Sequence, residues 1–273
     1  MLFFSGMLGG VISGLLGIGG GPVYVIILSY FINKMYGGQV SESTLVKLII
    51  ASTIFSTLFA ALSGSIKQYL NHNFYPKTVL TIAIPALLST MLVSYWVSTI
   101  NYSKLAFSLL FIALMVPLLY RMLSDKPNKK QFNQPFNIKI GFMIMLGTLS
   151  GALTALSGLG GGFAIIPLMN SLFNIKIKKV MSISLGVIFI VALANTFLNI
   201  FVLHYADAPP GSWGGIIPQV SLPMIAGVVI GSPIGVYIAK RMSPSVLRYA
   251  FVAFCCIIII KTIIGIVPLE AIH

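Results

Sequence analysis

Long apolar runs, separated by short polar stretches, make up most of the chain. About 20 apolar residues in a helix are enough to cross the roughly 30 Å hydrocarbon core of a bilayer. The runs cover residues 2–33, 44–63, 76–98, 102–122, 138–173, 180–204, 216–239 and 245–267. Since each run reaches that length, we predict an all-α integral membrane protein.

Composition and charge support this prediction. The 273 residues are 58% hydrophobic and 8% charged, with a mean hydropathy of +1.01, whereas about a quarter of the residues of a soluble domain are charged. The net charge of +13 comes from basic residues in the short loops between apolar runs, as the positive-inside rule describes. We therefore expect a lipid bilayer as partner, and no nucleic acid.

A polar linker divides the chain into two related halves. We predict a first membrane repeat at residues 1–123, a linker at 124–136 and a second repeat at 137–273. The stretch Gly10–Gly21 aligns without a gap on Gly151–Gly162 and keeps five glycines. The match indicates an internal duplication.

The first apolar run of each half contains three consecutive glycines. As one straight helix, residues 2–33 would be about 48 Å long at 1.5 Å per residue, and each glycine costs roughly 1 kcal/mol inside a helix. Pro22 follows the first triplet, and proline suits the first turn of a new helix. We predict two half-helices in each run, with unwound backbone between them.

The distribution of Lys and Arg indicates how these broken runs lie in the membrane. If both turn back and leave on the side they entered, one side of the membrane carries 13 basic residues and the other 4; if both cross, the split is 9 against 8. The strong bias expected of membrane proteins favours turning back. Each half then has a re-entrant hairpin and three transmembrane helices, and this odd number makes the two halves inverted repeats. The protein would lie in the cell membrane, with the linker in the cytoplasm and both termini outside the cell. Eight spanning helices in parallel halves are the alternative.

Unwound backbone at membrane depth leaves N–H groups without helical partners, and paired broken helices often form transporter substrate sites near the midplane. The start of each following half-helix carries a partial positive charge that suits an anion. The alternatives are that the glycines permit tight packing and that nearby hydroxyls bond between helices. The candidate substrate-binding residues are Gly19, Gly20, Gly21 and Pro22 at the first break, Gly160, Gly161, Gly162 and Phe163 at the second, and the hydroxyl residues Ser13, Ser52, Thr53, Thr154, Ser157, Ser182 and Ser184.

Acidic residues are absent from the core of every apolar run. We therefore expect no carboxylate proton relay, no metal site and no cofactor, which fits an anionic substrate. No catalytic set of residues is visible, so we do not expect an enzyme.

Gly6, Gly10 and Gly14, like Gly227, Gly231 and Gly235, have a small-xxx-small spacing that predicts close helix packing inside the protein.

These motifs resemble the sulfite exporter TauE/SafE family of membrane permeases. The resemblance rests on Gly17-Ile-Gly-Gly-Gly21, Gly158-Leu-Gly-Gly-Gly162, Lys179-Val-Met-Ser-Ile-Ser184 and Gly231-Ser-Pro-Ile-Gly235. It implies transport of a small sulfur-containing anion, such as sulfite or a sulfonate, across the cytoplasmic membrane in the direction of export. A sodium-coupled solute permease and a non-transporting assembly or sensor protein are the alternatives.

Overall fold

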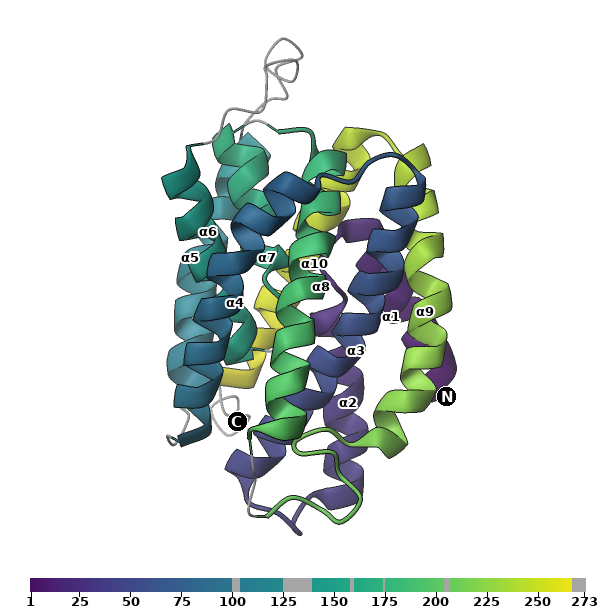
Figure 1. Ribbon diagram of the computed structural model, residues 1–273, viewed down its shortest axis with the longest axis vertical. Coiled ribbons are helices and arrows are strands. Elements are labelled where there is room, and N and C mark those ends of the chain that lie inside the picture. The colour runs from purple at the N-terminus through teal and green to yellow at the C-terminus, as the bar shows by residue number, and fades with distance from the viewer. Residues whose placement is uncertain (100–103, 125–138, 158–159, 174, 204–206, 267–273) are drawn as a thin grey trace, which may run out of the picture.

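The computed structural model describes residues 1–99, 104–124, 139–157, 160–173, 175–203 and 207–266, and these residues form a bundle of helices without named strands (Figure 1). Most of the predicted linker lies outside the described residues. The helices are α1 (Leu2–Leu16), α2 (Gly21–Tyr36), α3 (Glu42–Leu70), α4 (Pro76–Thr99), α5 (Lys104–Ser124), α6 (Ile140–Ser157), α7 (Gly162–Pro167), the π-helix η2 (Leu168–Leu172), α8 (Ile177–Phe201), α9 (Pro218–Arg241) and α10 (Pro244–Ile266).

The long helices confirm the prediction of an all-α membrane protein. Within the described residues, α3, α4, α8 and α9 are long and apolar enough to cross a bilayer. Two more helices, α5 and α10, have 21 and 23 residues, which is also sufficient for a crossing. The remaining helices, α1, α2, α6 and α7, are shorter and belong to the two broken runs.

In the first broken run, the chain turns back. Gly17 ends α1 in the left-handed conformation, and its N–H donates to the carbonyl of Ser13 at 2.8 Å. In Figure 1, α1 runs from the N-terminus toward the end of the bundle where α5 ends and α6 begins (the linker end), and α2 runs away from it. Leu2, from the start of α1, and Ile32, from late in α2, accordingly pack into one apolar cluster. The first broken run is thus a hairpin, and its re-entrance into the membrane stays a prediction.

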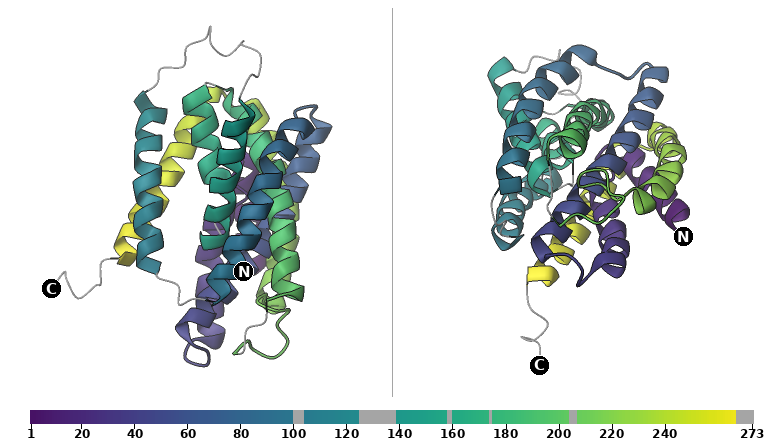
Figure 2. Two further views of the ribbon diagram at one scale, coloured as in Figure 1. Left: turned by 60° about the vertical axis from the view of Figure 1, so that its left-hand side comes forward. Right: turned by 60° about the horizontal axis from the view of Figure 1, so that its bottom comes forward.

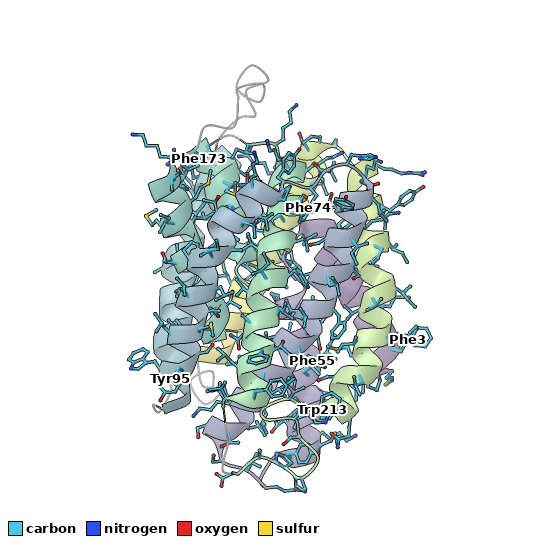
Figure 3. All side chains as sticks on the ribbon, viewed as in Figure 1. Phe3, Phe55, Phe74, Tyr95, Phe173 and Trp213 are labelled. Carbon is cyan, nitrogen blue, oxygen red and sulfur yellow. The ribbon has the colours of Figure 1, made fainter. Side chains whose placement is uncertain are left out.

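The second broken run turns back in the same way. The rings of Phe142, near the start of α6, and Phe173, just after η2, have centroids 4.4 Å apart. Figure 3 places Phe173 at the linker end of the bundle, so the chain returns to the side from which α6 departs. Both broken runs therefore fold back, as the predicted hairpins require, which favours that topology over eight spanning helices.

The first helix of each hairpin packs against a helix of the other half. Along α1 and α9, a Cβ atom on Gly6 would lie 2.2 Å from the carbonyl oxygen of Met224, and one on Gly14 would lie 2.0 Å from that of Ser232. Glycines of α9 approach α1 equally closely, with a Cβ on Gly231 only 2.1 Å from the carbonyl oxygen of Met7. The small-xxx-small stripes thus form an internal packing face, which confirms that prediction.

The corresponding pair for the second hairpin is α6, its first helix, with α4 of the first half. A Cβ on Gly147 would lie 2.4 Å from the carbonyl oxygen of Ile82, and one on Gly151 would lie 2.1 Å from that of Ala86. Both pairs are parallel, but α1 and α9 run toward the linker end whereas α4 and α6 run away from it (Figures 1 and 2). These opposite directions are those that an inverted repeat requires, and the exchange of helices joins the two halves into one body.

Candidate functional site

The two glycine breaks meet inside the protein. A Cβ atom on Gly160 would lie 3.1 Å from the carbonyl oxygen of Ile18, and one on Gly162 would lie 2.9 Å from the Cα atom of Ile18. Ile188 of α8 contacts both breaks, because its side chain lies 2.9 Å from a Cβ on Gly19 and 3.0 Å from one on Gly162. Two hairpins and a central helix therefore enclose one small region.

The backbone of this region uses conformations that favour glycine. Gly17, Gly19, Gly20 and Gly160 have φ angles of +72°, +76°, +77° and +82°, in the left-handed region that residues with a Cβ rarely occupy. The triplets therefore do more than permit packing, since they also make the sharp reversals between half-helices.

The amides of the glycines lack partners within the protein. No N–H of Gly19, Gly20 or Gly21, nor of Gly160–162, donates to another group in the described part of the chain. The carbonyl of Gly20, by contrast, accepts from the N–H groups of Val23 and Tyr24 at 3.0 and 3.1 Å. Each break thus offers donors while part of its acceptor capacity is already used.

The breaks face protein rather than lipid. Residues 16–22 and 160–170 are all buried inside the bundle. Buried backbone that lacks hydrogen-bond partners is costly in an apolar environment, and it is tolerated in membrane proteins where protein or a polar cavity surrounds it. The arrangement is therefore compatible with a site at membrane depth that is closed to both aqueous sides.

Four residues that carry a hydroxyl group, Thr57, Ser184, Tyr24 and Ser13, lie at or beside the breaks. The side chain of Thr57 lies against Gly19, the Oγ of Ser184 lies 2.8 Å from a Cβ on Gly162, and the hydroxyl of Tyr24 lies 2.6 Å from a Cβ on Gly20. Ser13 lies beside Tyr24. None of these hydroxyls, nor that of Thr53 on α3, has a hydrogen bond of normal geometry among the described residues. Buried hydroxyls in folded proteins are normally satisfied by protein, water or ligand.

Of these residues, Tyr24 and Thr57 were not among the sequence candidates. Tyr24 lies in the first turn of α2, three residues after Gly21, and Thr57 is in the middle of an apolar run that carries several hydroxyl residues. The position of Tyr24 beside a predicted break was a usable signal. The orientation of Thr57 depends on how α3 packs, which the sequence does not reveal.

Three other predicted hydroxyl residues serve the protein's own hydrogen bonding. Ser52 accepts from the N–H of Ile217 at 3.0 Å, at the start of α9. Thr154 donates to the carbonyl of Ser150 at 2.8 Å within α6, and Ser182 donates to the carbonyl of Asn73. The bonds of Ser52 and Ser182 join separate segments of the chain, which agrees with the interhelical alternative, whereas that of Thr154 stays within one helix.

The remaining candidates differ in how they lie. Pro22 is buried in the first turn of α2. Gly161 is helical and packs on Ser150, since its Cβ would lie 2.8 Å from that of Ser150. Phe163 directs its ring toward Phe251 and Phe254 of α10, at centroid distances of 6.3 and 6.4 Å. Ser157 ends α6, and its side chain lies outside the described residues.

The two hairpins are unequal in their second halves. Helix α2 has 16 residues, whereas α7 has 6 residues before it widens into the π-helix at Leu168. A regular helix several turns long places a partial positive charge at its N-terminus, so the field of the first hairpin is the stronger one. Glu42 and Asp207, the acidic residues that the structure describes, lie at a helix start and in a loop, away from both breaks.

A second polar cluster links α8 to α4. The amide of Asn195 donates to the hydroxyls of Thr90 at 3.1 Å and Ser94 at 2.8 Å, and the amide of Asn199 donates to the Oδ1 of Asn195 at 2.7 Å. All four residues are buried. Because this network satisfies its own members, it acts as a fixed joint between the helices.

At the linker end, Asn73 joins three helices. Its side-chain amide donates to the Oε1 of Gln68 at 2.9 Å and to the carbonyl of Lys178 at 3.2 Å. Its Oδ1 accepts from the hydroxyl of Tyr75 at 3.2 Å, and its carbonyl accepts from Ser182. These bonds connect the end of α3, the start of α8 and the segment that leads into α4.

Comparisons with known proteins agree with this architecture. A profile of the sulfite exporter TauE/SafE family matches residues 2–262. A "probable membrane transporter protein" of Methanocaldococcus jannaschii is 25% identical over 260 residues, covering 91% of this chain and 89% of the relative. Another, from Haemophilus influenzae, is 23% identical over 268 residues and 94% of each chain. No solved structure matches the chain significantly. The chain therefore belongs to the sulfite exporter TauE/SafE family of membrane transporters.

Proposed function

We propose that the protein carries a small sulfur-containing oxyanion, of the sulfite or sulfonate class, across the cytoplasmic membrane. The observation that carries this proposal is the meeting of the two breaks, where glycine N–H groups without partners lie beside the hydroxyls of Tyr24 and Ser184. These groups are all able to donate hydrogen bonds, and bonds to an ionised acceptor are roughly twice as strong as neutral ones.

An anion is favoured over a cation at this site. No carboxylate of the described residues lies near the breaks, and the N-terminus of α2 contributes partial positive charge. A sodium-coupled mechanism would need several oxygen ligands around the ion. The carbonyls of Gly20 and Gly161 already accept hydrogen bonds from the following helix turns, so these two oxygens are less able to bind a sodium ion.

Transport would require the closed site to open to each side in turn. The interlocked pairs α1–α9 and α4–α6 provide two stiff units, and the central helices α3 and α8 lie between them. We propose that one unit tilts against the other around the breaks, as in other transporters built from inverted repeats. An inside-negative potential favours anion efflux when no other ion is coupled, and this supports export.

Flux measurements in proteoliposomes test the proposal. Purified protein is reconstituted into vesicles loaded with sulfite, and efflux is followed with and without an imposed potential and with and without sodium. We expect efflux that needs the protein, needs no sodium and increases when the vesicle interior is negative. Efflux that stops without sodium would favour the cation-coupled alternative. Flux equal to that of empty vesicles for sulfite, sulfate, thiosulfate, sulfoacetate and taurine would support a non-transporting protein.

A further inference from the structure

The first hairpin contains a hydroxyl pair that the second hairpin lacks. Tyr24 is fully buried, and its ring lies between two glycines: its ring atoms are 2.6 Å from a Cβ on Gly9 of α1 and 2.5 Å from a Cβ on Gly20 at the break. Because both neighbours are glycines, the ring fits inside the hairpin with its hydroxyl at the level of the break.

The hydroxyl of Tyr24 has a neighbour but no hydrogen bond. Ser13, also fully buried, lies close enough to interact with it. Their contact is a weak one that does not reach normal hydrogen-bond geometry, and neither oxygen has another partner among the described residues. Two unsatisfied hydroxyls side by side in an apolar interior are costly, so their arrangement indicates that a third group satisfies both.

At the equivalent described positions, the second hairpin has no such pair. In the ungapped alignment of the two breaks, Thr154 occupies the position of Ser13 and Ile165 that of Tyr24. The hydroxyl of Thr154 is already bonded to the carbonyl of Ser150, and Ile165 is a fully buried apolar side chain. The polar difference between the hairpins therefore lies at the start of α2, which is also the longer of the two helices that follow the breaks.

We propose that Tyr24 and Ser13 bind the oxyanion group of the substrate, so that the anion lies against the first hairpin rather than midway between the two. This inference rests on the proposed function and assigns Tyr24 as a specificity-determining residue of that site. The phenol and the serine hydroxyl each donate to the anion, the N-terminus of α2 adds its partial charge, and the apolar side chains of Ile18 and Ile188 surround the remainder.

Binding measurements on detergent-purified protein test the assignment. The variants are Tyr24→Phe and Ser13→Ala. The matched control is Tyr30→Phe, which makes the same change on α2 at a tyrosine that is 64% exposed. A hydrogen bond to a charged group corresponds to roughly a ten- to hundredfold change in affinity, so we expect Tyr24→Phe to raise the Kd for sulfite by about that factor. We expect a smaller increase for Ser13→Ala and no change for Tyr30→Phe.

Thermal melting separates this role from a structural one. Removing an unsatisfied hydroxyl does not cost stability, so Tyr24→Phe without ligand should melt at the parent temperature or above, while the stabilisation by sulfite decreases. If Tyr24→Phe aggregates, Ser13→Ala decides by the same readouts.

The failure of this inference differs from the failure of the proposed function. Parent protein that binds no oxyanion would overturn both. Parent protein that binds sulfite, with Tyr24→Phe and Ser13→Ala both keeping its Kd while Gly162→Ala loses it, would overturn only the assignment of the hydroxyl pair.

Discussion

The Cα atom of Ile18 lies 2.9 Å from the position that a Cβ on Gly162 would occupy. Residues from the two halves of the chain therefore touch at the point where each hairpin reverses. At this distance even a methyl group has to displace backbone, because Ile18 contributes main-chain atoms to the contact. The size of residue 162 thus controls how closely the breaks approach each other.

We predict that Gly162→Ala reduces sulfite transport by at least about tenfold while the protein still folds. The added methyl group would press on Ile18 and on the Oγ of Ser184 at 2.8 Å, and geometric changes of about 1 Å at a functional site can cost about a hundredfold in rate. Efflux from proteoliposomes measures the loss. Gly141→Ala is the control, since nothing lies within 4 Å of a Cβ there. Parent-level efflux in Gly162→Ala would place the substrate elsewhere.

A second prediction concerns the α1–α9 contact. Gly14→Ala places a methyl group 2.0 Å from the carbonyl oxygen of Ser232, and overpacking of this kind typically costs about 1–3 kcal/mol. We expect a melting temperature several degrees lower, measured by the loss of monodisperse protein on heating. Gly141→Ala should leave it unchanged or slightly higher. An unchanged melting temperature for Gly14→Ala would mean that the two helices are less tightly packed.

A third prediction concerns the joint between α8 and α4. Asn195→Ala removes the donor to Thr90 and Ser94 and the Oδ1 acceptor of Asn199. Hydrogen bonds between membrane helices contribute about 0.6–2 kcal/mol, so we expect a moderate loss of stability in unfolding by denaturing detergent. A double-mutant cycle with Ser94→Ala should give a non-additive result. Additive effects would show that the two side chains act independently.

A fourth prediction concerns Asn73 at the linker end. Asn73→Ala removes the side-chain bonds to Gln68, Lys178 and Tyr75. Since these bonds hold α3, α8 and the segment before α4 together at the linker end, we expect the candidate site to open more readily to that side. A cysteine placed at Ser184 in a Cys255→Ala/Cys256→Ala background should then react faster with a small maleimide. Tyr69→Ala, on the exposed surface nearby, is the control and should not alter the rate.

The orientation of the protein in the cell membrane is a fifth prediction. Basic residues concentrate at the linker end, which the positive-inside rule places in the cytoplasm. In the cysteine-free background, Gln39→Cys at the opposite end should react with an impermeant maleimide in intact cells. Lys77→Cys at the linker end should react only after the cells are permeabilised. The reverse pattern would show that the linker is extracellular.

Much of the fold could be predicted because its signals are local. Three consecutive glycines before Pro22 indicate a helix break whatever surrounds them, and the count of basic residues on each side distinguishes hairpins from crossings. The partner helices could not be predicted in the same way. A stripe such as Gly6, Gly10 and Gly14 indicates close packing but does not specify which helix it meets, so the exchange between halves emerges only in three dimensions.

The candidate site follows from the sequence in its backbone and less so in its side chains, and its role stays a prediction. The glycine positions follow directly from the triplets. Hydroxyl residues are numerous in the apolar runs, and only packing separates those that hold helices together, such as Ser52 and Ser182, from those that lie at the breaks, such as Ser184. Tyr24 was missed because a tyrosine in an apolar run reads equally well as a residue that faces lipid.

The exchange of helices between the halves also determines the order in which the protein can mature. Gly6 of α1 packs on Met224 of α9. The first hairpin therefore leaves the ribosome long before α9 is synthesised. Until α9 is inserted, the glycine stripe of α1 is not packed against its partner helix. A chain truncated before α9 would therefore leave that stripe open to quality-control proteases, even though every residue of the first half is present.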